Sequence, residues 1–263
     1  MVSAWPHDGI TPVELWDVRV GDTTLFQLRD EPSFYRTLVT AVLALRAGKA
    51  VRESGALLPA MAWDAVALVG GSLDETRARD AFDAAGVVLD IVAADPFFAS
   101  SHAREALVEY GPAYETSIVI DVGQTALKGV GATTRIHRPR KTDQAAADAR
   151  QALVEFVGGA LAGACEGRAP SFVLLALPCE VEDRGGKLVL GASTYPTAGE
   201  GDALVAEILD RAGCEGVTCA VVNDAVLAAW ALARRVPSMT VSRLVLTLGL
   251  GVGAALVDRT SPA

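Results

Sequence analysis

One predicted β-hairpin in the middle of the sequence has an aspartate, a glycine and a threonine at its bend and a lysine just beyond. The apolar run 118–120 ends at Asp121, and a turn follows that contains Gly123 and Thr125. A second apolar run then returns past Lys128, a pattern typical of a β-hairpin. A carboxylate beside glycine amides suits a magnesium phosphate, because amides bind phosphate oxygens and the carboxylate holds the metal or its water. An ordinary hairpin with the aspartate as a turn residue is the alternative.

A second group of polar residues lies at another predicted strand end. The sequence Val221-Val222-Asn223-Asp224-Ala225 predicts a strand that delivers two polar side chains to the start of a helix. Open α/β sheets bind ligands at the carboxyl ends of their strands, so a carboxylate here is well placed beside a ligand. Asparagine and aspartate are also preferred helix N-caps, so simple capping is the alternative.

Glycines gather at two further predicted turns, in residues 246–253 and 66–72. Glycine lets a backbone come close to a phosphate, and a tight hairpin is the alternative for the first of these turns. The second turn joins an apolar strand to a predicted helix and has little specificity by itself. The residues concerned are Gly249, Gly251 and Gly253 in the first turn, and Gly70, Gly71 and Ser72 in the second.

Strands and helices alternate along the chain, which predicts an α/β fold. Short apolar runs bounded by turn residues predict strands, and longer runs with apolar residues three or four apart predict helices. Residues 13–30 predict one or two strands, 135–141 predict a basic loop or a third strand, and Gly111-Pro112 is the best candidate domain boundary. The other expected strands are 63–69, 87–92, 118–120 with 127–130, 171–177, 217–222, 244–248 and 254–257. The expected helices are 34 to near 55, 74–85, 100–110, 142–165, 201–213 and 225–235.

Composition excludes several classes of function. The chain has 263 residues, enough for one large or two medium domains. Its net charge of −9 argues against non-specific nucleic-acid binding, because no basic stripe could offset phosphate repulsion. We expect no signal peptide, because the first residues have no basic segment followed by an apolar core. We expect no membrane span, since the apolar stretches are broken by charge or glycine well before ~18 residues. The four cysteines lack Cys-x-x-Cys spacing, which predicts buried free thiols and a cytoplasmic protein.

Together these stretches resemble motifs of the actin-like ATPase superfamily of sugar kinases, heat-shock chaperones and actins. Residues 121–128 resemble its first phosphate motif, and residues 247–253 resemble its second. Residues 70–72 resemble its adenosine motif, and residues 97–104 resemble the segment that follows that motif. The similar stretches span residues 60–258.

Among the subfamilies, the ROK-type sugar kinases are the most similar. Their catalytic aspartate lies in an Asn-Asp-Ala segment at a strand–helix junction, which Asn223-Asp224-Ala225 matches. The strand that ends at Leu177-Pro178 also lies where that subfamily has a Val-Pro-Gly segment.

The order of the motifs differs from that of the family, in which the first phosphate motif comes first and the adenosine motif last. Here the adenosine-like stretch leads and the second phosphate-like motif ends the series. This order implies an α/β, two-lobed actin-like ATPase (ribonuclease H-like) fold that is circularly permuted. We expect an adenosine-side lobe of residues 1–112, completed by 246–263, and a phosphate-1 and acceptor-side lobe of residues 113–245. A truncated kinase with an unrelated N-terminal domain is the alternative.

The resemblance implies an ATP-dependent kinase that transfers the γ-phosphoryl group to a hydroxyl of a sugar-like small molecule with Mg²⁺. Asp121 is the expected metal ligand and Asp224 the expected catalytic base. Asn223 and Pro178 are the expected substrate contacts. The expected nucleotide contacts are Gly123, Thr125, Lys128, Gly249, Gly251, Gly253, Gly70, Gly71 and Ser72.

Other functions stay open on the sequence alone. One is an actin-like nucleotide-binding or ATPase module without small-molecule kinase activity, and another is an α/β binding protein that takes no nucleotide. For Lys128, a solvated hairpin end is an alternative to a position near phosphates. The expected partners are a nucleotide and a small-molecule acceptor, with no nucleic acid and no membrane, and a homodimer is left open.

Overall fold

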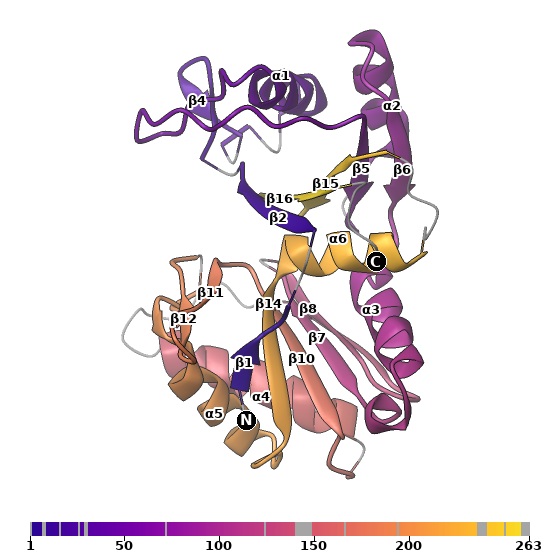
Figure 1. The fold of residues 1–263 in the computed structure, drawn as a ribbon, viewed down its shortest axis with the longest axis vertical. Coiled ribbons are helices and arrows are strands. Elements are labelled where there is room, and N and C mark those ends of the chain that lie inside the picture. Colours follow the sequence, from indigo (N-terminus) through magenta and orange to yellow (C-terminus); the bar gives the residue numbers. More distant parts are fainter. Residues whose placement is uncertain are drawn as a thin grey trace. The chain divides into compact units, whose positions relative to one another are not determined.

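Figure 1 shows the computed structural model of the chain, which divides into two compact units. Unit 1 comprises Met1–Pro6 and Ala99–Leu227, and unit 2 comprises His7–Phe98 and Ala228–Ala263, so the chain changes unit three times. The described residues are 2–6, 9–15, 17–25, 27–28, 31–71, 73–123, 125–139, 149–165, 167–193, 195–235, 241–249 and 251–258.

Unit 1 is built on a six-stranded mixed sheet in the order β1-β14-β10-β7-β8-β9. Strands β1, β14, β10 and β7 are parallel, and β8 is antiparallel to both of its neighbours. A small antiparallel sheet of β11, β12 and β13 follows β10 in the chain. The strands are β1 (Val2–Ala4), β7 (Ile118–Val122), β8 (Ala126–Val130), β9 (Arg135–Pro139), β10 (Phe172–Leu177), β11 (Val181–Asp183), β12 (Leu188–Leu190), β13 (Gly199–Glu200) and β14 (Thr218–Asn223).

Two helices cover one face of the unit 1 sheet. Side chains alternate between the faces of a strand, and Ile118 and Ile120 of β7 share one buried cluster with Leu161 of α4 and Ile208 of α5. The opposite face of β7 therefore carries Val119 and Asp121. The helices are α3 (Phe98–Glu109), the 3₁₀ helix Pro112–Tyr114, α4 (Ala149–Cys165), α5 (Gly201–Arg211) and α6 (Asp224–Arg235), and the changes of unit fall within α3 and α6.

Unit 2 is built on a five-stranded mixed sheet in the order β2-β16-β15-β5-β6. Its buried cluster joins Leu38 of α1 and Phe82 of α2 to Leu68 and Leu246 of the sheet. The two-stranded sheet of β3 and β4 comes between β2 and α1 in the chain. The elements are β2 (Ile10–Glu14), β3 (Arg19–Val20), β4 (Thr23–Thr24), α1 (Phe34–Arg46), β5 (Ala65–Val69), α2 (Glu75–Ala84), β6 (Leu89–Ala93), β15 (Arg243–Leu248) and β16 (Val252–Val257).

The five strands of the unit 2 sheet have the same topology as five strands of the unit 1 sheet, without β1, once the strands of unit 2 are read from β15. In unit 1 the hairpin β7–β8 leads to β9, α4 precedes β10 and α5 precedes β14, and the strand order is β9-β8-β7-β10-β14. In unit 2 the hairpin β15–β16 pairs with β2, α1 precedes β5 and α2 precedes β6. The directions of the strand pairs agree as well. Each sheet is therefore centred on one hairpin, but the unit 2 hairpin follows its partner strands in the chain.

The predicted α/β class is confirmed, and one helix is shorter than predicted. Helix α1 ends at Arg46 because Gly48, with a φ of 64°, ends it in a Schellman motif. The Gly48 N–H donates to the Leu45 carbonyl at 3.1 Å, and the Lys49 N–H donates to the Ala44 carbonyl at 2.8 Å.

Several elements and bounds differ from the expectations. The short strands β1, β2, β11, β12 and β13 are not predicted by the sequence pattern, while β9 confirms the strand alternative for 135–139. The units change near residues 98 and 227, whereas the expected lobes change near 112 and 245, and β1 joins the unit 1 sheet. The predicted helix start at 142–148 lies outside the described residues. None of the helices in the described part of the chain is long and apolar enough to cross a membrane.

Gly70, which follows β5, is packed against the end of β15. Its φ is 151°, and a Cβ at this position would overlap the carbonyl oxygen of Leu248 and lie 3.1 Å from the carbonyl carbon. A Cβ at Gly71 would lie 3.1 Å from the Cβ of Pro96. Gly70 is therefore required by backbone packing within unit 2, whereas Gly71 is only in close contact with the side chain of Pro96.

We predict that Gly70→Ala destabilises the protein by about 3 kcal/mol, because a strained φ and an overlap with Leu248 add together. Gly55→Ala is the matched control, since Gly55 also has a positive φ, of 86°, but nothing lies within 4 Å of its Cβ position. The control should lose only about 1 kcal/mol. Urea unfolding measures both values, and equal losses would contradict the packing role of Gly70.

Candidate functional site

The predicted polar residues of unit 1 meet at one edge of its sheet. Strands β7, β10 and β14 are parallel neighbours, and their register pairs Ala176 with Asp121 and Leu177 with Asn223. Asp121, Pro178 and Asn223 therefore all lie at the carboxyl edge of these three strands. Ligands of open α/β sheets bind at this edge.

Asp121 is paired with Lys128 across the hairpin. The two residues are direct partners in the register of β7 and β8, so their side chains lie on the same face of the sheet. The Lys128 Nζ lies 3.3 Å from Asp121 Oδ2. Asp121 is buried and Lys128 is half-buried. A buried carboxylate needs such a partner, because burial without one is costly.

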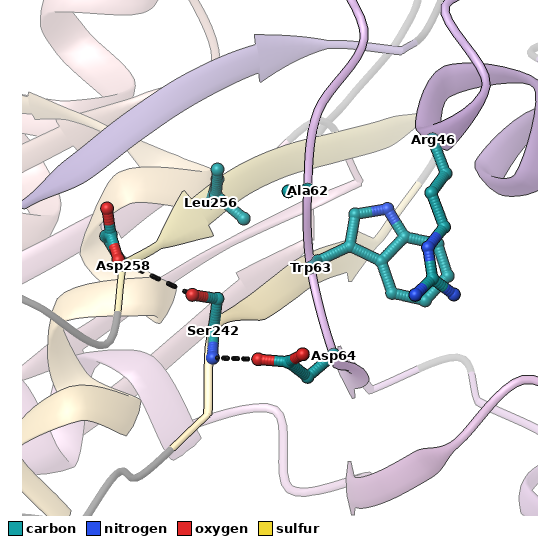
Figure 2. A pocket seen from close by; sticks show the side chains of 7 residues that line it. All are labelled: Arg46, Ala62, Trp63, Asp64, Ser242, Leu256 and Asp258. Atoms are coloured by element: carbon teal, nitrogen blue, oxygen red, sulfur yellow. Dashed lines mark hydrogen bonds between the residues drawn. The ribbon is translucent and has the colours of Figure 1, made fainter.

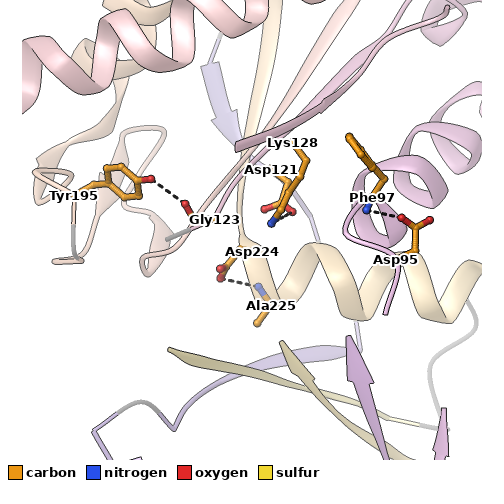
Figure 3. Close-up of polar contacts among 8 residues, drawn as sticks. All are labelled: Asp95, Phe97, Asp121, Gly123, Lys128, Tyr195, Asp224 and Ala225. Carbon is orange, nitrogen blue, oxygen red and sulfur yellow. Dashed lines mark hydrogen bonds and ion pairs between the residues drawn. The ribbon is translucent and has the colours of Figure 1, made fainter. Parts of the chain in front are cut away.

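Gly123 occupies a position in the turn that only glycine fits. A Cβ there would lie 2.8 Å from Lys128 Nζ and 2.9 Å from the Ala126 carbonyl oxygen. The Gly123 carbonyl accepts a hydrogen bond of 2.8 Å from the hydroxyl of Tyr195. Thr125 is exposed on the same turn, and Gln124 lies outside the described residues. The glycine thus makes room for the lysine, and its carbonyl is held from the other side (Figure 3).

Asn223 caps helix α6. Its Oδ1 accepts from the backbone N–H groups of Ala225 at 2.9 Å and Val226 at 3.2 Å. Its Nδ2 donates to the Cys179 carbonyl at 2.9 Å. Asn223 is therefore a helix N-cap, as the capping alternative predicts. The Asn223 side chain also connects the segment after β10 to the start of α6.

Asp224 begins helix α6 beside the pair of Asp121 and Lys128 (Figure 3). Its Oδ1 accepts a hydrogen bond of 2.8 Å from the Ala225 N–H. Burial, and secondly the negative charge of Asp121, raise the pKa of Asp224 to about 7. The Ala225 N–H and the charge of Lys128 oppose this rise. A carboxyl with a pKa near neutrality can both accept and release a proton at physiological pH.

The donor set of this site suits a hard cation that is shared with a phosphate. Among the described residues, no group of three or more His, Cys, Asp and Glu side chains could hold a metal ion. Mg²⁺ usually takes only one or two protein carboxylates and completes its octahedron with water and phosphate oxygens. Asp121 supplies one such carboxylate, so the residues present fit a magnesium ion that is bound together with a phosphate group.

The other predicted nucleotide contacts belong to unit 2. Gly249 and Gly251 lie in the turn between β15 and β16, where the Gly249 N–H donates to the Gly251 carbonyl at 3.1 Å. No atom lies within 4 Å of a Cβ built at Gly249, so this turn has open space beside it. Gly253 lies within β16. Ser72, like Leu250, lies outside the described residues. The structure thus groups Asp121, Gly123, Lys128 and Asp224 in unit 1, and places the remaining glycines in unit 2.

The sequence pattern did not predict the segment that contacts the turn between β7 and β8. Tyr195 lies between β12 and β13, and its hydroxyl reaches Gly123, which is 72 positions away. The pKa of the Cys179 thiol is raised to about 12, chiefly by burial, so the thiol stays protonated at neutral pH. A conspicuous aromatic residue among the small and polar residues of 191–197 is the one local signal that could have pointed to this segment.

A hollow of about 410 Å³ lies elsewhere, within unit 2 (Figure 2). Apart from Arg46, which ends α1, its residues come just before β5 and β15 or lie at the end of β16. This is the edge of the sheet opposite to the glycine turn. The Arg46 guanidinium stacks 4.6 Å from the centre of the Trp63 ring, and Asp64 accepts from the Ser242 N–H at 2.9 Å. The lining residues are Arg46, Ala62, Trp63, Asp64, Ser242, Leu256 and Asp258, none of which is a predicted site residue.

Comparisons with protein-family models, curated proteins and solved structures give no match. The assignment of the site therefore depends on the geometry and chemistry of the residues described above.

We predict that Asp224→Asn changes how stability depends on pH. The folded-state pKa of about 7 lies above the unfolded value near 3.8, so the native state binds the proton more tightly. Between these values the free energy of unfolding of the native chain should fall as pH rises. Because the variant has no proton to lose at this position, the native chain should lose on the order of 3–4 kcal/mol relative to it across this range.

Urea unfolding at intervals from pH 4 to pH 8 measures this difference. Asp210→Asn is the matched control, because Asp210 is exposed at the end of α5 and lies outside the site. Parallel stability curves for the native chain and Asp224→Asn would show that the carboxyl is not held in this environment.

Proposed function

We propose that the protein is an ATP-dependent kinase that transfers the γ-phosphoryl group to a hydroxyl of a sugar-like small molecule with Mg²⁺. The observation that carries the proposal is the convergence of Asp121, Lys128 and Asp224 at the carboxyl edge of β7 and β14. Two carboxylates and an ammonium group beside a glycine turn are the groups that phosphoryl transfer requires for positioning and charge stabilisation.

The repeated topology supports an actin-like, circularly permuted fold as part of this proposal. Each unit has a glycine-containing hairpin at the centre of a sheet, and the two hairpins occupy corresponding positions. Strands from residues 10–93 pair directly with β15 and β16 in one sheet. That pairing favours a permutation over a truncated kinase with an unrelated N-terminal domain.

Each residue of the unit 1 site has a role in the proposed reaction. Asp121 holds the metal directly or through a water molecule, and Lys128 attracts phosphate oxygens. The Gly123 amide and the Thr125 hydroxyl bind phosphate. When bound, Mg²⁺ neutralises charge on the phosphates of ATP.

Asp224 acts as the general base in this proposal. It takes the proton from the acceptor hydroxyl as that oxygen attacks the γ-phosphorus, while the bond from the γ-phosphorus to the bridging oxygen breaks and ADP leaves. Its pKa of about 7 suits a base that works near neutral pH, and such a step contributes roughly 10²–10⁴ in rate. Pro178 lies at the same edge, where it can contact the acceptor.

A nucleotide-binding or ATPase module without kinase activity is the second candidate. The observation that favours it is the engagement of Asn223, whose Oδ1 caps α6 and whose Nδ2 holds the Cys179 carbonyl. The side chain expected to contact an acceptor is thus already used within the fold. Hydrolysis needs only a positioned water molecule in place of the acceptor.

We predict that Mg-ATP raises the melting temperature of the native chain, because a ligand that binds the native state stabilises it by mass action. ADP release should then increase when a suitable member of a panel of sugars and polyols is added. Asp224→Asn should lose at least about 100-fold of this acceptor-dependent rate. Asp210→Asn should retain it.

The possible outcomes separate the candidates. Turnover that ignores both the acceptor and the Asp224→Asn change would favour the ATPase candidate and rule out the kinase. If Mg-ATP leaves the melting temperature unchanged at millimolar concentration, both nucleotide functions are wrong.

A further inference from the structure

We propose that Tyr195 is a positioning residue that holds the phosphate-binding turn of the β7–β8 hairpin in register with the start of α6. This inference rests on the proposed function, in which that turn binds phosphate. Tyr195 touches none of the reacting groups and acts through the carbonyl of Gly123.

The contact between Tyr195 and the turn is buried and specific. The Tyr195 ring is buried, and its hydroxyl donates to the Gly123 carbonyl at 2.8 Å. Gly123 has little freedom on the other side, because Lys128 Nζ occupies the space where a Cβ would stand. The Gly123 carbonyl is therefore held by the tyrosine hydroxyl, and Lys128 Nζ fills the space beside the Gly123 Cα. Because a peptide group is planar, this hydrogen bond fixes the orientation of the peptide group that follows Gly123, which leads into the turn toward Thr125.

The segment that carries Tyr195 is itself held by several hydrogen bonds. The Ser193 hydroxyl accepts from the Tyr195 N–H at 3.0 Å, and the Tyr195 carbonyl accepts from the Thr197 N–H at 2.8 Å. The Thr197 hydroxyl donates to the Gly191 carbonyl at 2.9 Å. Tyr195 is thus anchored before it reaches the turn, which a positioning residue requires.

The same segment is connected to Asp224 at its other end. The Gly191 N–H donates to the Glu180 carbonyl at 2.9 Å, and the neighbouring Cys179 carbonyl accepts from Asn223. Asn223 caps the helix that begins with Asp224. A continuous series of hydrogen bonds therefore links the turn at Gly123 to the start of α6. Its effect is to keep the proposed phosphate-binding groups and the proposed base in a constant relative position within unit 1.

Tyr195→Phe tests the inference, because it removes the hydroxyl and keeps the ring that fills the buried space. Tyr114→Phe is the matched control in the same unit, since the Tyr114 ring packs edge-on against Phe172 at 5.2 Å and lies away from the turn. Tyr195→Phe should bind Mg-ADP about 3- to 10-fold more weakly in calorimetry, the range expected for losing one hydrogen bond. Tyr114→Phe should bind as the native chain does.

Amide hydrogen exchange tests whether the effect of the lost hydroxyl is confined to the β7–β8 hairpin, and the affinity for Mg-ADP tests whether it reaches the ligand. Without nucleotide, Tyr195→Phe should speed exchange in peptides that cover residues 118–130, with β10 and β14 unchanged. Exchange that accelerates throughout the sheet, or an unchanged affinity for Mg-ADP, would overturn the inference.

The design distinguishes this inference from the proposed function. If the native chain binds no Mg-ADP, the proposed function fails and this inference fails with it. If the native chain and Tyr195→Phe bind Mg-ADP equally well, only the role of Tyr195 is wrong.

Discussion

Two carboxylates lie near one another at the carboxyl edge of the unit 1 sheet, and Lys128 is the cation that stands beside them. The negative charge of Asp121 and the burial of Asp224 both disfavour ionisation of Asp224, and Lys128 relieves this only in part. Such an arrangement is unfavourable by itself, because like charges at low exposure raise the free energy of the folded state. It persists because the strand register fixes Asp121 opposite Lys128 and because α6 must start where Asp224 stands. A cation or a proton taken up at this edge would remove the imbalance.

The surrounding elements explain why this edge is rigid. The apolar residues of β7, β10 and β14 that face α4 and α5 are buried in one cluster, so the strand ends cannot shift independently. Asn223 and Tyr195 then join the strand ends and turns through side-chain hydrogen bonds. The packed strands therefore position Asp121 and Asp224, and the side-chain hydrogen bonds of Asn223 and Tyr195 hold the turns between the elements.

Local patterns predicted a large part of this fold and several residues that lie together in the candidate site. The hairpin of β7 and β8, the buried strand β10, and the junction of Asn223 and Asp224 could be predicted because their signals lie within a few neighbouring residues. The contact of Tyr195 with Gly123 could not, because it joins residues 72 positions apart and no short-range pattern encodes it. Strand β1 was missed for the same reason, since its three residues gain their structure from pairing with β14. Gly70 shows a different limit: a glycine needed for close backbone approach was predicted as a ligand contact, while the neighbour that fills the space is the Leu248 carbonyl.

The position of β15 in unit 2 has a consequence for how the chain folds during synthesis. β15 is the central strand of its sheet, between β16 and β5, yet it is made after every other strand of unit 2 except β16. Until β15 emerges from the ribosome, β5 lacks a neighbour on one side, and β2 has no strand to pair with until β16 follows. The strands of the main unit 1 sheet are all available by residue 223. Unit 1 can therefore fold first. Until the hairpin of β15 and β16 is made, unit 2 exposes apolar surface that is buried in its folded state, and chaperones bind such surface.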